Sequence, residues 1–310
     1  MYSINVLVMT YNQHNVIGRL LDSILCQKEY GLNKIIICDD CSTDNNVEVI
    51  QRYVDKYPDY FKLYVNEHNL GIYGNAHHRF EVKGDADLFV TMSGDDSLCD
   101  GWFKTIQEFI SHHKLDVQNE AFTIYSDWKI VDCNGKEAIY LNDKVADLSH
   151  PIMDYRLRGL ITLRSLIHTR KMVERLKPVD LTHGVPYAES MYENQYVTLS
   201  DKNYYCPFIA SIYYSGIGFS TKTHTIEYKK DILYCREQLL SSGQWSQQNE
   251  FFIKSLIELS KVEIYHSFKS FCLYIYYYLK SGSLGMGCSF HQFARKSAHK
   301  FLASIVLRKQ

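Results

Sequence analysis

The sequence is poor in the residues and patterns that mark disordered, fibrous or membrane-spanning proteins. Only 5 Pro and 16 Gly occur among 310 residues, which argues against disorder and against fibrous repeats. Lys and Arg number 34 and Asp and Glu 35, so the formal net charge of −1 gives no support to nucleic-acid binding. The most apolar run, residues 271–279, is about half of the ~20 residues that a membrane-spanning helix needs.

Nothing in the cysteine pattern indicates a disulfide framework. The nine cysteines are odd in number and scattered, which is typical of reduced thiols in a cytosolic protein. Cys38 and Cys41 form one Cys-x-x-Cys pair, but no second Cys or His pair has zinc-site spacing, so we interpret both as structural thiols. The first ten residues lack a basic start followed by a long apolar run, so no signal peptide is predicted. We expect a cytoplasmic protein that is soluble or peripheral on the inner face of the cell membrane.

Glycine-rich nucleotide loops and the serine nucleophile elbow are also missing. The glycines at 71 and 74, and those at 282, 285 and 287, match no Walker loop and no Gly-x-Gly-x-x-Gly after a first strand. This disfavours a dinucleotide-binding fold. No Gly-x-Ser-x-Gly sequence occurs, which gives no support to a serine hydrolase of that type.

The hydrophobic pattern predicts strands that alternate with helices. Short apolar runs predict buried strands at 4–9, 34–38, 61–65, 87–92 and 121–126. Helical spacing of apolar residues predicts helices at 16–27, 45–57 and 101–113, and a loop at 69–75 leads into another helix. This alternation predicts an α/β fold with a mostly parallel central sheet. Residues 1–220 are interpreted as this domain, and residues 221–310 as a helical C-terminal region with helices at 227–240, 250–279 and 291–307.

Three polar clusters follow buried strands, at residues 10–12, 39–44 and 94–96. Open α/β sheets bind ligands at the carboxyl ends of their strands, so these clusters are the candidate site. A carboxylate in residues 39–44 can accept a hydrogen bond from a base N–H or a ribose hydroxyl. Ser42, Thr43 and Asp44 can also cap the next helix.

The strongest candidate metal ligands are Asp95 and Asp96. Adjacent carboxylates at a strand end are costly unless a cation neutralises them, and Mg²⁺ or Mn²⁺ is held by such oxygens together with nucleotide phosphates. The alternative is a solvated turn that caps the helix near Gly101, but the position after the fourth strand favours the metal. Asp85 and Asp87 fit an Asp-x-Asp pattern but precede that strand, so we interpret them as a surface turn at the wrong edge.

Residues 6–12, 39–44, 69–74 and 93–96 resemble, in order and spacing, the motifs of inverting glycosyltransferase family 2. The resemblance covers the first ~130 residues well, thins toward residue 220 and leaves the tail uncovered. It implies a GT-A fold and transfer of a sugar from a nucleotide-sugar, with a UDP-sugar as the first choice of donor. Relatives in bacterial surface-polysaccharide assembly, such as O-antigen or capsule, imply a glycan or lipid-linked acceptor.

The resemblance also implies roles for individual residues. Asp95 and Asp96 would hold the diphosphate and the Mg²⁺ or Mn²⁺, with Asp96 as the direct ligand. The residues implied at the nucleotide-sugar are Thr10, Tyr11 (beside the base), Asn12, Asp40, Asn69, Gly71, Asn75 and Asp95.

The general base is less well defined. The family supplies it from a Glu-Asp pair ~90–100 residues after the metal site, where it takes a proton from the acceptor hydroxyl. No such pair occurs here: Glu189 is followed by Ser190, and Glu193 by Asn194. Glu189 is the preferred base and Glu193 the second candidate. The alternatives are that one or both simply solvate a helix start, or that the chain is an inactive member of the family.

The C-terminal region has a residue pattern of its own, and two other functions compete with glycosyl transfer. Residues 268–278 and 291–309 mix aromatic and basic residues, a pattern that can lie on an anionic membrane; packing on the catalytic domain or a dimer is the alternative. A nucleotidyltransferase would also place carboxylates and a metal at such a sheet edge, but it would need a Gly-rich basic loop after the first strand, and none is present. A catalytically inactive nucleotide-sugar-binding protein is the other competing function.

Overall fold

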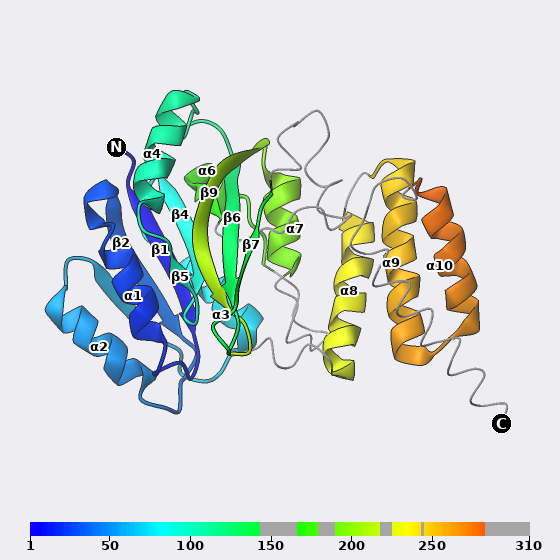
Figure 1. Ribbon diagram of the computed structural model, residues 1–310, viewed down its shortest axis with the longest axis horizontal. Coiled ribbons are helices and arrows are strands. Elements are labelled where there is room, and N and C mark those ends of the chain that lie inside the picture. Colours follow the sequence, from blue (N-terminus) through cyan, green and yellow to red (C-terminus); the bar gives the residue numbers. More distant parts are fainter. Residues whose placement is uncertain (143–165, 179–189, 218–224, 243–244, 283–310) are drawn as a thin grey trace. The chain divides into compact units, whose positions relative to one another are not determined.

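The computed structural model describes residues 1–142, 166–178, 190–217, 225–242 and 245–282 (Figure 1). These residues form two compact units. The first unit holds the described residues of 1–142, 166–178 and 195–217, and the second holds those of 190–194 and 225–282. The domain boundary expected at residue 220 stays a prediction.

Nine strands of the described residues form one sheet in the first unit. Along the sheet their order is β3-β2-β1-β4-β8-β6-β9-β5, and β7 pairs with β6. The strands are β1 (Ile4–Thr10), β2 (Leu32–Asp39), β3 (Phe61–Val65), β4 (Leu88–Ser93), β5 (Ser97–Leu98), β6 (Phe122–Val131), β7 (Glu137–Tyr140), β8 (Ile167–Thr169) and β9 (Lys202–Tyr214). The five strands expected from the sequence are β1, β2, β3, β4 and β6, and each is confirmed.

The sheet is mixed, and its parallel part carries the candidate site. Strands β3, β2, β1 and β4 are mutually parallel, as the alternation of strands and helices predicts. Strand β8 is antiparallel to both β4 and β6, so β4 and β6 point the same way, and β9 is parallel to β6. The α/β class is therefore confirmed, while the sequence did not indicate the antiparallel pairs.

Helices cover both faces of the parallel strands. Helices α1 (Ile17–Leu25) and α4 (Trp102–His112) place their buried residues in one core with alternate residues of β1, β2 and β4. Helix α2 (Asn46–Lys56) packs beside α1 and β3. Helix α3 (Gly71–Glu81) contacts β1 and β2, and its Arg79 lies near Cys38. The Cys38 side chain points away from the face that Ile37 shares with α1, so α3 covers the opposite face.

The second unit contains the long helices of the C-terminal region. Helix α9 (Gln247–Tyr265) packs against α8 (Ile226–Ser242) and α10 (Phe268–Lys280). The helix expected at 227–240 is confirmed as α8, but a single helix over 250–279 is wrong. His266 adopts a left-handed φ of 52° and ends α9, and the hydroxyl of Ser267 then accepts from the Ser270 N–H to start α10. The helix expected at 291–307 lies outside the described residues.

Three shorter helices complete the description. They are η1 (Lys28–Tyr30), α6 (Arg170–Glu174) and α7 (Ser190–Leu199). In the described part of the chain, no helix combines the length and the apolar character needed to cross a membrane.

Candidate functional site

The three polar clusters meet at one edge of the sheet. Thr10, the last residue of β1, pairs with Asp39 at the end of β2, and Met9 pairs with Ser93 at the end of β4. Residues 10–12, 39–44 and 94–96 therefore leave neighbouring strands at the same level. We call these three segments, with the loop 66–71, the rim.

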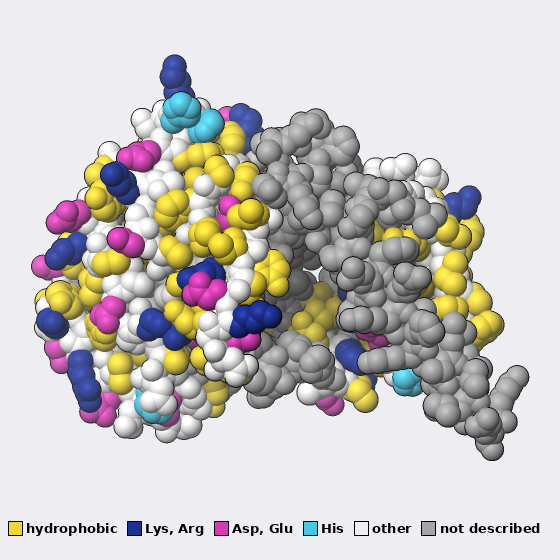
Figure 2. Space-filling view, in the orientation of Figure 1, with side chains coloured by type: hydrophobic (Ala, Val, Ile, Leu, Met, Phe, Trp, Pro, Cys, Tyr) yellow, Lys and Arg dark blue, Asp and Glu magenta, His cyan; other side chains and the backbone are white. Residues whose placement is uncertain are grey.

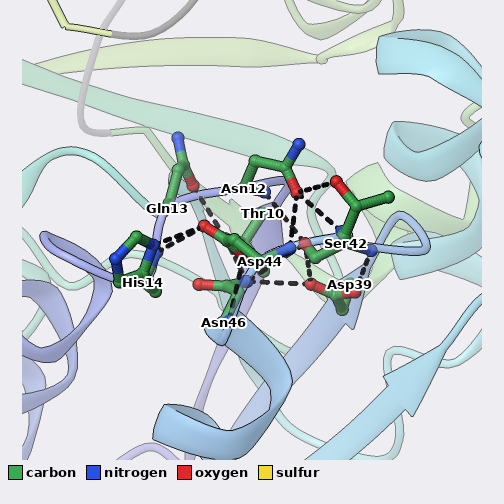
Figure 3. Close-up of polar contacts among 9 residues, drawn as sticks. Thr10, Asn12, Gln13, His14, Asp39, Ser42, Asp44 and Asn46 are labelled. Atoms are coloured by element: carbon green, nitrogen blue, oxygen red, sulfur yellow. Dashed lines mark hydrogen bonds and ion pairs between the residues drawn. The ribbon is translucent and has the colours of Figure 1, made fainter.

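A buried carboxylate that the sequence analysis did not single out organises the rim (Figure 3). Asp39 is fully buried and accepts hydrogen bonds from the backbone N–H and the hydroxyl of Ser42. It also accepts from the amide nitrogen of Asn46, the first residue of α2. Its neighbour Asp40 points to the other face of the sheet. The two carboxylates therefore accept hydrogen bonds on opposite faces, Asp39 from Ser42 and Asn46 and Asp40 from Asn66 and Leu70.

The side chain of Asn12 joins the first cluster to the second. Asn12 has a positive φ of 52°, and its Oδ1 accepts from the backbone N–H groups of Thr43 (2.8 Å) and Asp44 (3.3 Å). Its own N–H donates to the hydroxyl of Ser42. The Asn12 amide oxygen is thus engaged within the protein, so its effect on a donor would act through the shape of the loop.

A hydrogen-bonded His–Asp pair flanks this junction. His14 Nδ1 lies 2.7 Å from Asp44 Oδ2, and the His14 backbone N–H donates to the same oxygen. Burial alone would raise the pKa of Asp44, but the hydrogen bonds from His14 and from the Asn46 N–H lower it below its ordinary value. Asp44 Oδ1 also accepts from the N–H of Asn46, the first residue of α2, but the N-cap position itself is Asn45, whose side chain makes no capping hydrogen bond.

Thr10 and Tyr11 face different surroundings. The Thr10 hydroxyl donates to Gln13 Oε1 (2.8 Å) and accepts from the Asn46 amide (3.0 Å), and the residue is buried. Tyr11 is 44% exposed. Of these two predicted contacts, Tyr11 has the open side chain that could lie beside a base.

Asp40 holds the loop that precedes α3. Its Oδ1 accepts from the Asn66 amide (2.9 Å) and from the Leu70 N–H (2.7 Å), while its carbonyl oxygen accepts from the Asn69 amide. The Asn69 Oδ1 in turn accepts from the N–H of Gly71, whose φ is 72°. Asp40, Asn69 and Gly71 therefore lie together on the rim.

Asn75 lies deeper than the other predicted donor contacts. It sits within α3, is buried, donates to the Cys38 carbonyl oxygen and accepts from Asn66. Asn66 is also bonded to His78 Nδ1 at 2.6 Å. Any influence of Asn75 on a donor would therefore pass through Asn66 and Asp40.

The predicted metal ligands follow β4 in a turn that is packed tightly against β1. The Gly94 N–H donates to the Met9 carbonyl, and a Cβ on Gly94 would lie 2.3 Å from Gln13 Oε1 and 2.9 Å from Thr10 Oγ1. A larger residue at this position would have to displace the side chains of Gln13 and Thr10. The Asp95 carbonyl accepts from Arg19 Nη2 at 2.6 Å, and the Arg19 guanidinium lies 3.4 Å from the centre of the Tyr214 ring.

The two carboxylates differ in accessibility. Asp95 is buried and Asp96 is partly exposed, which agrees with Asp96 as the more direct ligand. Among the described residues, no three His, Cys, Asp or Glu side chains are grouped to hold a metal. Mg²⁺ and Mn²⁺ commonly use one or two carboxylates and complete their shell with substrate phosphates and water. The pair fits a cation of this kind, held jointly with a diphosphate.

Asp85 and Asp87, the Asp-x-Asp pair that precedes β4, lie at the opposite edge of the sheet, where the parallel strands begin. Asp87 accepts from the N–H and hydroxyl of Ser3, at the start of β1, and from Gln118. Asp85 forms an ion pair with Arg170. Both are therefore engaged away from the rim, as the sequence order indicated.

The predicted general bases are not placed by the structure. Glu189 lies outside the described residues. Glu193 falls within α7, but its side chain is not among those described. The choice between them stays a prediction.

The chain is similar to known glycosyltransferases. Residues 5–127 match the family described as Glycosyl transferase family 2. Over 119 residues the chain is 27% identical to the poly(ribitol-phosphate) β-N-acetylglucosaminyltransferase TarS of Staphylococcus aureus, which covers 38% of this chain and 20% of that protein. The aligned segments span only 20% to 38% of the length of the curated relatives.

Solved structures share the fold over most of the chain. S. aureus TarS 1-349 in complex with UDP-GlcNAc matches with a TM-score of 0.61 and 13% identity, over 91% of this chain and 81% of that one. The mannosyltransferase PcManGT from Pyrobaculum calidifontis, in complex with GDP-Man and Mn²⁺, matches with a TM-score of 0.55 and 13% identity, over 100% and 81%. At this identity the likeness shows the fold, and it confirms the GT-A architecture.

Proposed function

Because residues 5–127 match glycosyltransferase family 2, we propose that the protein transfers a sugar from a nucleotide-diphosphate donor to a glycan or lipid-linked acceptor. The observation that carries this proposal is the rim itself. It places an open aromatic ring (Tyr11), a loop clamped by Asp40 and an adjacent carboxylate pair (Asp95 and Asp96) at the carboxyl ends of three neighbouring parallel strands.

Each part of the rim suits one part of a nucleotide-sugar. Tyr11 would lie against the base, and the backbone around Asp40 would meet the nucleoside. Asp95 and Asp96 would hold Mg²⁺ or Mn²⁺, which neutralises charge on the leaving diphosphate when it is bound. A UDP-sugar is the preferred donor because the TarS structures contain UDP-GlcNAc and UDP, whereas PcManGT contains GDP-Man and Mn²⁺.

The proposed reaction is a single displacement with inversion. A general base takes the proton of the acceptor hydroxyl while that oxygen attacks the anomeric carbon and the bond to the diphosphate breaks. Glu189 is the preferred base and Glu193 the alternative. The acceptor class is inferred from the resemblance to enzymes of bacterial surface-polysaccharide synthesis, which would place the protein in the cytoplasm.

The test is incubation of the protein with Mn²⁺, a panel of nucleotide-sugars and lipid-linked or free glycan acceptors. Acceptor-dependent release of nucleoside diphosphate with a glycosylated product supports the proposal. Pyrophosphate formation would instead identify a nucleotidyltransferase. Donor binding in calorimetry without turnover on any acceptor would identify an inactive nucleotide-sugar-binding protein. This alternative is motivated by the sequence, because Glu189 is followed by Ser190 and not by the Asp of the family's Glu-Asp pair.

A further inference from the structure

Helix α10 has more apolar surface than its packing within the second unit uses. Ten of its thirteen residues are Phe, Tyr, Leu, Ile or Cys, and a helix that is apolar all round is normally buried on every side. One face is buried: Tyr274 and Tyr278 are buried, and Tyr278 and Tyr277 pair with Phe252 and Phe251 of α9. Helix α9 therefore covers one side of α10.

The other side forms an exposed apolar stripe. Its members are spaced by three or four residues and so share a helix face. The exposed fractions are 62% for Phe268, 42% for Ile275, 51% for Tyr276 and 53% for Leu279, and Cys272 between them is also exposed. Figure 2 shows hydrophobic side chains gathered over α10. A contiguous exposed patch of this kind marks an interaction surface rather than scattered surface residues.

Along the sequence, the residues from 264 onward carry charge of one sign, whereas the neighbouring helix α9 carries a Glu250–Lys254 ion pair near Tyr277. Glu263 is the last acidic residue of the chain, so all 35 Asp and Glu precede residue 264. Seven of the 34 Lys and Arg follow it: Lys269, Lys280, Arg295, Lys296, Lys300, Arg308 and Lys309. Lys269 and Lys280 stand at the two ends of the α10 stripe. A chain with a net charge of −1 therefore ends in 47 residues that carry only basic charges.

We propose that the exposed stripe of α10 docks in the interfacial layer of an anionic lipid bilayer. Apolar and aromatic side chains would enter the acyl boundary while Lys269 and Lys280 meet the lipid phosphates, as in other basic amphipathic helices. Thirteen residues measure only about 20 Å, so the helix lies in the plane of the surface and does not cross it. A second copy of the chain is a poorer occupant, because two α10 faces would bring lysines against lysines.

The test is flotation of the full-length protein with vesicles of phosphatidylcholine alone or of phosphatidylcholine with about one third phosphatidylglycerol. We expect binding to the anionic vesicles that weakens as salt is raised. Ile275→Glu should lower the partition coefficient by about tenfold or more, since it removes an aliphatic side chain and adds a negative charge. Ile139→Glu, at a site on β7 that is 55% exposed, is the matched control and should bind like wild type.

A second variant tests the charge separately. The double substitution Lys269→Gln and Lys280→Gln keeps the apolar stripe and should lower binding to anionic vesicles by about tenfold or more, at about 1 kcal/mol per lysine. Circular dichroism confirms that each variant is folded. Vesicle binding needs no donor, so a failure of the transferase proposal leaves this test intact.

Four results would overturn the proposal. The first is wild-type protein that floats with neither vesicle type, and the second is equal binding to neutral and anionic vesicles. Ile275→Glu could float like wild type. Finally, light scattering could show that Ile275→Glu converts a wild-type dimer to a monomer, in which case a second copy covers the stripe.

Discussion

Asp96 is the residue on which the metal assignment depends. It is the more exposed of two adjacent carboxylates at the end of β4, and the loss of a metal ligand weakens charge stabilisation on the leaving diphosphate by several kcal/mol. We therefore expect Asp96→Asn to lower kcat by two or more orders of magnitude while circular dichroism stays unchanged. EDTA should abolish wild-type turnover, and Mn²⁺ should restore it.

Asp85→Asn is the matched control, because it removes the same charge from an Asp-x-Asp sequence at the opposite edge of the sheet. It should keep wild-type kcat. Full activity of wild type in EDTA, together with an inactive Asp96→Asn, would leave Asp96 with a role that does not involve a metal.

Glu189 and Glu193 are the residues on which the mechanism depends. Removing a general base typically lowers the rate by ~10²–10⁴. Glu189→Gln is expected to fall in this range with nucleotide affinity retained, and Glu193→Gln to lose less. Steady-state kinetics and calorimetry on both variants decide, with the exposed Glu174→Gln as control. The reverse order would assign the base to Glu193, and two active variants would place it elsewhere.

His168 gives a residue-scale prediction about stability. It is fully buried on β8, with Nδ1 3.0 Å from the Thr123 hydroxyl, and burial, with a smaller contribution from Arg79, lowers its pKa to about 3. The unfolded chain therefore binds this proton first, near pH 6.5. The free energy of unfolding should hold above that pH and fall below it, by about 2 kcal/mol at pH 5 from this group.

The check is urea unfolding of wild type and His168→Gln between pH 7.5 and 5. The variant should lose part of the pH slope, whatever its stability at pH 7.5. His112→Gln, on the exposed side of α4, should keep the wild-type slope. An unchanged slope in His168→Gln would contradict the assignment.

At the scale of elements, α3 is tied to the rim by one buried amide. Asn66 donates to Asp40 and Asn75, and its oxygen lies 2.6 Å from His78 Nδ1. Asn66→Leu should lower the free energy of unfolding by about 1–3 kcal/mol, because it leaves buried polar partners unsatisfied. It should also weaken nucleotide binding, since Asp40 loses one of the two donors that fix it. Calorimetry with UDP tests this, with the exposed Asn119→Ala as control; unchanged affinity would separate Asn66 from the donor loop.

The elements that the sequence predicted are those with strong apolar periodicity. Strands β1 to β4 and helices α1 and α4 bury regular sets of Ile, Leu, Val and Phe, and such patterns are readable without tertiary information. Strand β8 has three residues, which is too short for any period. Strand β9 contains Pro207, and its register with β6 shifts beyond Cys206, so its pattern is not a simple alternation.

Two further features could not be predicted from the sequence. One is the break between α9 and α10, and the other is the set of hydrogen bonds between residues far apart in the sequence. The break between α9 and α10 has neither Gly nor Pro, because His266 supplies the left-handed residue. In the rim, the positions of Asp40, Asp95 and Asp96 followed from strand ends. The amides of Asn46 and Asn66 did not, because their partners lie 26 or 36 residues away and depend on the register of β1, β2 and β3.

At the scale of the whole molecule, the rim and the exposed stripe of α10 belong to different compact units. Every rim residue comes from the first 96 positions, whereas α10 belongs to the second unit. The acidic residues are confined to the part of the chain before residue 264. Substitutions that test the proposed donor chemistry and the proposed membrane attachment therefore lie in separate units.

Metal and nucleotide together should stabilise the molecule far more than either does alone. Asp95 and Asp96 are not joined by a third metal-binding side chain in the described part of the chain, so the diphosphate must supply the remaining oxygens. Mn²⁺ alone and UDP alone should each raise the Tm slightly. Together, at about 100 times Kd, they should stabilise the folded state by about 2.7 kcal/mol, which corresponds to a rise of about 5–10 °C.

Differential scanning calorimetry of wild type and Asp96→Asn measures this coupling. The variant should lose the increment that depends on both ligands and keep the response to UDP alone. If the two units unfold in separate transitions, only the one that contains the rim should move, because a ligand stabilises the structure that binds it. A Tm rise with Mn²⁺ alone that equals the rise with both ligands would show a metal site complete within the protein, and the joint site at the end of β4 would then be wrong.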